Sequence, residues 1–142
     1  MKISARNVFE GKITQLTPGA VNAEVELTTA GGDKIVAIVT SESVKSLGLA
    51  IGKTALAFVK APWVIVMADD VPVQFSARNR LNGKVSALTK GAINSDVSIQ
   101  LAGGTEVHAV ITNDAVSELG LAVGKPASAL IKASHVILGV PA

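Results

Sequence analysis

Two groups of hydrogen-bond donors occur twice in the chain at the same spacing. Ser-Ala-Arg-Asn stands at residues 4–7 and again at 76–79, and Lys-Ala stands at residues 60–61 and again at 132–133. Arginine presents a planar fork of five N–H donors, lysine presents three, and hydroxyl groups add more. Two cations with several neutral donors suit a small, doubly charged oxyanion. The residue types leave a second interpretation open, in which these cations are solvated or form ordinary surface ion pairs.

Residues typical of an enzyme active site do not repeat in this way. His108 and His135 align with Val36 and Trp63 of the first copy, so no catalytic histidine is common to both copies. We therefore predict surface or interface histidines. Cysteine is absent, and the sequence contains no phosphate-binding loop, dinucleotide fingerprint or nucleophile elbow. The expected protein is a binding protein and not an enzyme.

The donors repeat because the whole chain is a tandem duplication. Residues 3–70 align with residues 75–142 without a gap, and 30 of the 68 aligned pairs are identical. The joint at residues 68–74 is short and contains a proline, which favours modules packed together over modules on a flexible tether. We predict two domains, at residues 1–70 and 71–142, because long internal repeats usually correspond to structural units.

Each copy has the pattern of a small β-sheet domain. Residues 22–29 alternate in polarity, residues 34–40 form a β-branched run, and the Ala-Gly-Gly-Asp between them suits a hairpin turn. The second copy repeats this pattern. Glu24 and its counterpart Asp96 fall on the presumed solvent face of the alternating strand, where a surface role is expected.

A short helix and further strands complete each copy. The helix is predicted at residues 41–49, with Thr40 or Ser41 as the N-cap and Gly48 as the stop. Gly11 and its counterpart in the second copy predict a bulge or bend in the first strand. About five strands and one helix in fewer than 70 residues predict an all-β fold of tandem OB-type five-stranded β-barrels, each with one short helix.

The composition excludes several classes of partner. The formal charge is only +2 and aromatic residues make up 3% of the chain. A nucleic-acid binder needs a basic face and rings for base stacking, so no nucleic-acid partner is expected. No apolar run approaches the roughly 18–20 residues of a membrane helix, and the polar start lacks a signal-peptide core. We predict a cytoplasmic protein with no membrane partner.

Two modules of this size predict association between chains. A domain of about 60 residues buries only about 60% of the surface that its unfolded chain exposes. Here there is no disulfide and few large aromatic side chains to compensate. The abundant small and β-branched residues therefore predict burial between modules and between chains, in an obligate homo-oligomer.

Taken in order, these motifs resemble the Mop-domain, or molbindin, family of small OB-type modules. The motifs that carry the resemblance are residues 4–7, 19–22, 40–44 and 60–61, with their counterparts 76–79, 91–94, 112–113 and 132–134. The resemblance implies that the chain binds molybdate through hydrogen bonds, without direct ligation of the metal, at interfaces between modules. It also implies a homotrimer that serves intracellular molybdenum storage or homeostasis. Tungstate, which is nearly the same size, is expected to bind as well, and no other cofactor is expected.

The resemblance further implies which residues hold the oxyanion. They come from the Ser-x-Arg motif, the helix start and the Lys-Ala motif: Ser4, Arg6, Thr40, Ser41, Lys60, Ala61, Ser76, Arg78, Thr112, Lys132 and Ala133. A second kind of site in the family uses the turn before the alternating strand, which corresponds to Ala20, Val21, Asn22, Ala92, Ile93 and Asn94. Two other functions stay open, a structural or adaptor module that has lost anion binding and an OB-fold nucleic-acid binder.

Overall fold

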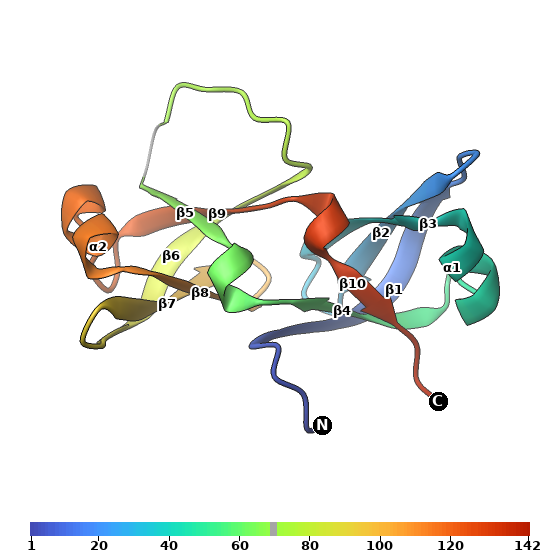
Figure 1. The fold of residues 1–142 in the computed structure, drawn as a ribbon, viewed down its shortest axis with the longest axis horizontal. Coiled ribbons are helices and arrows are strands. Elements are labelled where there is room, and N and C mark those ends of the chain that lie inside the picture. The colour runs from blue at the N-terminus through green and yellow to red at the C-terminus, as the bar shows by residue number, and fades with distance from the viewer. Residues whose placement is uncertain (69–70) are drawn as a thin grey trace.

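The duplicated sequence forms two antiparallel sheets that lie side by side (Figure 1). The computed structural model describes residues 1–68 and 71–142. The first repeat forms β1 (Asn7–Thr17), β2 (Asn22–Thr29), β3 (Lys34–Thr40), α1 (Ser41–Leu47), β4 (Thr54–Val59), η1 (Ala61–Trp63) and β5 (Ile65–Ala68). The second forms β6 (Asn79–Lys90), β7 (Asn94–Leu101), β8 (Glu106–Thr112), α2 (Asn113–Leu119), β9 (Pro126–Ile131), η2 (Ala133–His135) and β10 (Ile137–Gly139).

In each five-stranded sheet, one edge strand comes from the other repeat. The strand orders are β10-β4-β1-β2-β3 and β5-β9-β6-β7-β8. Leu138 in β10 pairs with Ala57 in β4, and Val66 in β5 pairs with Ala129 in β9. The predicted all-β class, with two five-stranded units and one short α-helix in each, is confirmed. The exchange of β5 and β10 was not predicted, and the division at residue 70 stays a prediction about the sequence repeats.

The local elements follow the sequence pattern closely. In β2, every second side chain from Ala23 to Leu27 is buried, as the polarity pattern predicts. Thr40 caps α1 by accepting a hydrogen bond from the Ser43 main-chain N–H. Gly48 ends the helix at a φ of 63°, in the left-handed region where a side chain is unfavourable.

The predicted bulge at Gly11 is wrong in its position. Gly11 pairs with Thr29 in regular register, and the register shift lies between Ile13 and Gln15. The glycine is required for a different reason, because a β-carbon at this position would collide with the carbonyl oxygen of Thr28. The second repeat has the same arrangement, with its shift between β6 residues 85 and 87.

A buried asparagine from each repeat fastens one sheet to the edge of the other. Asn7 Nδ2 donates to the His108 carbonyl oxygen at 2.8 Å, and its Oδ1 accepts from the His108 N–H at 2.7 Å. Asn79 makes the same pair of bonds to the main chain of Val36, both at 2.7 Å. Each side-chain amide therefore acts as an extra backbone peptide for an edge strand, β8 or β3.

The β2–β3 and β7–β8 hairpins also meet at this junction. The Asp33 carboxylate accepts hydrogen bonds from the main-chain N–H groups of Gly103 at 3.0 Å and Thr105 at 3.2 Å. Around these contacts, buried residues of both repeats form one continuous hydrophobic cluster. The repeats are thus joined by exchanged strands, by paired amides and by a shared core.

We predict that Asn7→Ala and Asn79→Ala each lower the free energy of unfolding by about 2–4 kcal/mol. Each change leaves a buried N–H and a buried carbonyl of the facing strand without partners. Chemical denaturation followed by circular dichroism measures the loss. The matched control is Asn82→Ala on the exposed side of β6, which should cost less than about 0.5 kcal/mol. Equal losses for buried and exposed asparagines would contradict this account of the junction.

We also predict that residues 73–142 produced alone associate into a dimer by exchanging β10. In the separated repeat, β9 lacks β5 and β10 lacks β4, so both present open edges to another copy. Light scattering coupled to size-exclusion chromatography measures the mass. The control fragment, residues 73–136, lacks β10 and should not form this dimer. A folded monomer of residues 73–142 at micromolar concentration would show that exchange is not needed.

Candidate anion-binding site

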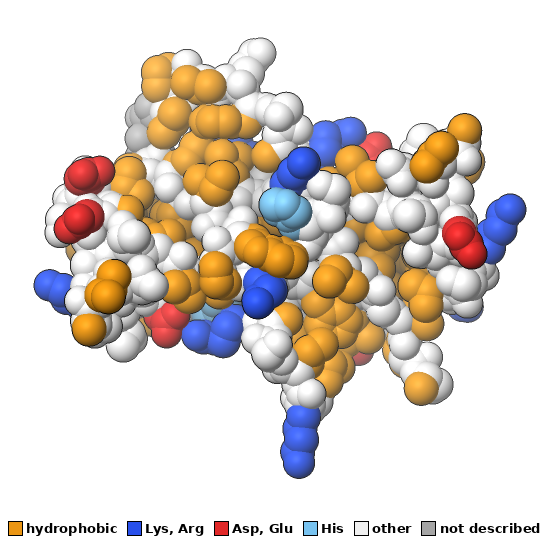
Figure 2. Space-filling model, viewed as in Figure 1, with side chains coloured by type: hydrophobic (Ala, Val, Ile, Leu, Met, Phe, Trp, Pro, Cys, Tyr) orange, Lys and Arg blue, Asp and Glu red, His pale blue; other side chains and the backbone are white. Residues whose placement is uncertain are grey.

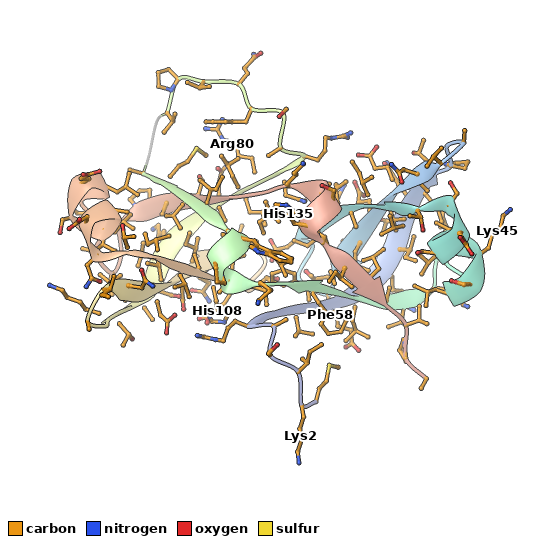
Figure 3. The ribbon with its side chains drawn as sticks, in the orientation of Figure 1. Lys2, Lys45, Phe58, Arg80, His108 and His135 are labelled. Carbon is orange, nitrogen blue, oxygen red and sulfur yellow. The ribbon has the colours of Figure 1, made fainter. Side chains whose placement is uncertain are left out.

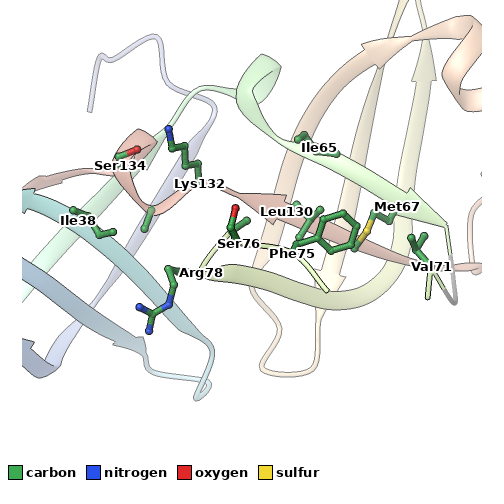
Figure 4. Close-up of a pocket in the computed structure, with 12 residues that line it drawn as sticks. Ile38, Ile65, Met67, Val71, Phe75, Ser76, Arg78, Leu130, Lys132 and Ser134 are labelled. Atoms are coloured by element: carbon green, nitrogen blue, oxygen red, sulfur yellow. The ribbon is translucent and has the colours of Figure 1, made fainter. Parts of the chain in front are cut away.

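Four of the predicted residues line one pocket beside the junction of the repeats. Ser76, Arg78, Lys132 and Ala133 surround a cavity of about 430 Å³ (Figure 4). Its other lining residues are mostly apolar and come from both repeats: Ile38, Ile65, Met67, Val71, Phe75, Ala77, Leu130 and Ser134. Because β5 crosses into the second sheet, Ile65 and Met67 of the first repeat lie against Leu130 of the second. The strand exchange thus builds one wall of this pocket.

Hydrophobic side chains continue from the pocket over the segment that leads from residue 71 into β6 (Figure 2). Val73 and Phe75 in this segment are exposed, and the Arg80 guanidinium lies 5.9 Å from the Phe75 ring. Ile65 at the pocket is 61% exposed, although its neighbour Val66 is buried. The pocket is therefore an open, largely apolar hollow with a few polar groups at its edge.

The two cations of the pocket extend in different directions. Figure 4 shows the Lys132 ammonium and the Arg78 guanidinium on opposite sides of Ser76. Arg78 Nη1 lies 2.6 Å from Glu24 Oε1, in an ion pair with the first repeat. The structure therefore brings the predicted residues to one pocket without aiming both charges at one point.

The corresponding residues of the first repeat show the same pairing across the junction. Arg6 Nη1 lies 3.4 Å from Asp96 Oδ2, so each arginine meets the carboxylate of the other repeat. Lys60 is exposed, with its Nζ 6.0 Å from the centre of the Trp63 ring, and Ala61 is buried. Ser4 lies in the exposed segment that precedes β1. The expectation that Glu24 and Asp96 are simple solvent-facing residues is wrong for Glu24, whose Oε1 is buried.

The predicted helix-start residues lie elsewhere, at the two ends of the molecule. Thr40 and Thr112 cap α1 and α2, which stand at opposite ends in Figure 1, and neither threonine lines the pocket. The Ser41 hydroxyl donates to the Gly19 carbonyl oxygen at 2.9 Å. Asn113, which replaces Ser41 in the second repeat, donates to the Gly91 carbonyl oxygen at 3.0 Å. The replacement of Ser41 by Asn113 therefore preserves a hydrogen bond from the helix start to the carbonyl oxygen of the turn glycine.

The residues of the predicted second site occupy the turns before β2 and β7. Val21 and Ile93 at these turns are 74% and 75% exposed, and their carbonyl oxygens accept hydrogen bonds from the first residue of each helix. Asn94 lines a shallow pocket of about 260 Å³. Ala20 and Ala92 belong to the same two turns, Asn22 is the first residue of β2, and all three are exposed.

Several residues of the shared motifs have structural partners that sequence reasoning missed. Asn7 and Asn79 stand in the donor motifs, but both amides are used within the chain, as described above. Glu24 and Asp96 form ion pairs with the arginines of the Ser-x-Arg motifs. The sequence signal for these pairs was that both repeats keep an acidic residue and an arginine at equivalent positions. The partner lies in the other repeat, so strand spacing within one repeat could not reveal it.

The histidines take up separate positions, shown in Figure 3. The His135 ring packs against Trp63 with 5.2 Å between ring centres, and His135 is exposed, as predicted for a surface histidine. His108 is half-buried, and its Nδ1 lies 2.9 Å from Ser98 Oγ. Within residues 1–68 and 71–142, no three histidine, aspartate or glutamate side chains gather as they would around a metal ion.

No helix in the described part of the chain is long and apolar enough to span a membrane.

Comparison with known proteins identifies the family. The sequence matches the TOBE domain over residues 3–66 and 76–138. It is 44% identical over 141 residues to the molybdenum-pterin-binding protein MopA of Rhodobacter capsulatus, covering 99% of this chain and 53% of MopA. Molybdenum-pterin-binding protein 2 of Clostridium pasteurianum is 46% identical over 68 residues, which is 48% of this chain and all of that protein. The chain thus spans about half the length of curated relatives such as MopA.

A solved structure matches the whole chain. The cytoplasmic molybdate-binding protein ModG, in a crystal form with molybdate bound, is 56% identical, with a TM-score of 0.94. The match covers 99% of this chain and 100% of that chain. The resemblance to the Mop-domain family that the motifs indicated is confirmed by these matches. The chain therefore belongs to the TOBE domain family, as a tandem pair of Mop-type domains.

Proposed function

We propose that this chain binds molybdate as a non-catalytic, cytoplasmic protein of molybdenum storage or homeostasis. The observation that carries the proposal is the single pocket that Ser76, Arg78, Lys132 and Ala133 all line. The likeness to ModG over both full chains supports molybdate as the ligand, since that structure has molybdate bound. The names of the other relatives, which include a molybdenum transport protein of Herbaspirillum seropedicae, point to the same element.

The chemistry of the donor set fits a tetrahedral dianion. Molybdate has four acceptor oxygens and, near neutral pH, no proton to donate. One arginine and one lysine balance its two charges, and hydroxyl and main-chain N–H groups occupy the remaining lone pairs. In the second repeat these are Arg78, Lys132, the Ser76 hydroxyl and the N–H groups around Ala133. The corresponding set in the first repeat is Ser4, Arg6, Lys60 and Ala61.

Selectivity follows from the same donors. Arginine, lysine and main-chain N–H groups can only donate, so they disfavour protonated phosphate, whose hydroxyl is left without an acceptor when it is buried against them. Sulfate has the same charge as molybdate but shorter bonds, so only the size of the cavity discriminates against it. Tungstate is nearly the same size as molybdate and is expected to bind with similar affinity.

We further infer that complete sites form between chains, in a homotrimer. In one chain the charged ends of Arg78 and Lys132 point apart, and the pocket is open on one side. The predicted residues Thr40 and Thr112 lie at opposite ends of the molecule, at the starts of α1 and α2 (Figure 1). Exposed apolar side chains lie in the turns near these helices: Val21, Ile51, Ile93 and Val123. Contact with other chains would cover these apolar residues and add helix-start hydroxyls to the sites.

We predict that isothermal titration detects tight binding of molybdate and tungstate and much weaker binding of sulfate and phosphate. Arg6→Ala combined with Arg78→Ala should abolish most of the molybdate binding, because it removes one of the two balancing charges from every site. The control is Lys84→Ala, which removes an exposed cation from β6 outside the pocket and should leave binding unchanged.

The outcome also separates the competing functions. Absence of molybdate binding by the wild-type protein would contradict the proposal and favour a structural or adaptor module, in which the pairs Arg6–Asp96 and Arg78–Glu24 serve only to join the repeats. Sedimentation of the same sample measures the number of chains, and a stable monomer would contradict the trimer.

A further inference from the structure

Arg78 stands between two cavities that offer it different partners. On one side it lines the large pocket with Ser76 and Lys132. On the other it lines a small cavity of about 40 Å³, together with Glu24 and Glu26 of the first repeat. The guanidinium contacts Glu24 at 2.6 Å, and Figure 4 shows it directed away from Ser76 and Lys132. In this structure the Arg78 guanidinium therefore pairs with the Glu24 carboxylate and does not point into the large pocket.

The backbone of Glu24 is held in place by the sheet. Its neighbours Ala23 and Val25 are buried in β2, and Glu24 pairs in the sheet with Ile38, which forms part of the pocket wall. Its Oε1 is buried and has the Arg78 guanidinium as its ionic partner, with no aligned hydrogen bond. If Arg78 turned into the pocket, this buried oxygen would lose its counter-ion.

The first repeat has a looser version of the same pair. Arg6 and Asp96 are 3.4 Å apart, and the Asp96 side chain is 45% exposed, compared with 30% for Glu24. Aspartate is one methylene shorter than glutamate, so its carboxylate reaches less far toward the arginine. Water also screens the more exposed pair more strongly.

We propose that Glu24 is a displaceable counter-ion, which must release Arg78 before an oxyanion binds and so lowers the affinity of that site, and that Asp96 does the same more weakly for Arg6. This proposal rests on the proposed function, because it assigns the competing partner of the same arginines. The two carboxylates thereby make the two sites of one chain unequal, with the Arg6 site the tighter.

The size of the effect follows from simple electrostatics. A carboxylate and a dianion compete for one guanidinium, and the remaining negative charge also repels the dianion. A unit charge about 6 Å from a dianion changes the binding constant roughly tenfold even at the dielectric constant of water. Neutralising Glu24 without changing its shape should therefore strengthen binding by about that factor.

The test is isothermal titration of the full-length protein with sodium molybdate. We expect Glu24→Gln to lower the Kd of the Arg78-dependent sites about tenfold and Asp96→Asn to lower that of the Arg6-dependent sites about two- to threefold. Glu10→Gln changes the net charge equally at an exposed position of β1 and should leave every Kd unchanged. An unchanged or higher Kd in Glu24→Gln overturns the proposal.

Two further variants test whether Glu24 acts by competing for Arg78 or only through its negative charge. Glu24→Asp keeps the charge but shortens the side chain, as in the second repeat, and should lower the Kd about two- to threefold. In an Arg78→Ala background, Glu24→Gln should strengthen binding clearly less than it does with Arg78 present, since the competition has been removed and only the repulsion between the carboxylate and the dianion remains. Equal strengthening with and without Arg78 overturns the proposal, because the carboxylate would then act through its field alone.

Failure of this inference is distinguishable from failure of the proposed function. If wild-type protein binds molybdate and the Glu24 variants do not bind it more tightly, only the counter-ion role is overturned. If wild-type protein binds no molybdate, both are overturned. Thermal melting without ligand checks that each variant is folded, and Asp96→Asn gives an independent test at the more exposed pair.

Discussion

An open sheet edge must find a partner, and this requirement governs the structure. Neither sheet has five strands without the other repeat, because β10 completes the first sheet and β5 completes the second. The crossing segments η1 and η2 are therefore carried to the boundary between the sheets, together with the Lys-Ala pairs that lead into them. The Ser-x-Arg motifs reach the same boundary from the starts of β1 and β6. The candidate site therefore forms where β5 and β10 cross from one repeat into the sheet of the other.

The sequence predicted those parts of the fold that depend on near neighbours. Strands β2 and β3 have the predicted bounds, since alternation and β-branching are local properties, and Gly48 ends α1 as expected. The exchange could not be predicted, because a run such as Ile65–Ala68 has the same pattern whether it pairs within its own repeat or with the other. The bulge was misplaced because Gly11 is needed for a close approach of the neighbouring strand and not for a change of register.

The same division applies to the site. The repeated motifs predicted that Ser76, Arg78, Lys132 and Ala133 belong together, and one pocket contains all four. What they could not predict is which polar groups are already used within the chain. Asn7 is bonded to the facing strand and Arg78 is paired with Glu24, and both partners lie in the other repeat. A count of donors in a motif therefore overestimates the donors that are free for a ligand.

Fusion of the two repeats also relaxes a restriction that two-fold symmetry imposes on identical partners. In a pair of identical modules, a residue at the axis meets its own copy. Here Asp33 meets the N–H of Thr105, the residue at the equivalent position, and Trp63 packs against its equivalent, His135. Two aspartates at the hairpin junction would repel each other, whereas one aspartate can accept two hydrogen bonds. A covalently joined pair can thus evolve a complementary, asymmetric centre that two identical halves could not form.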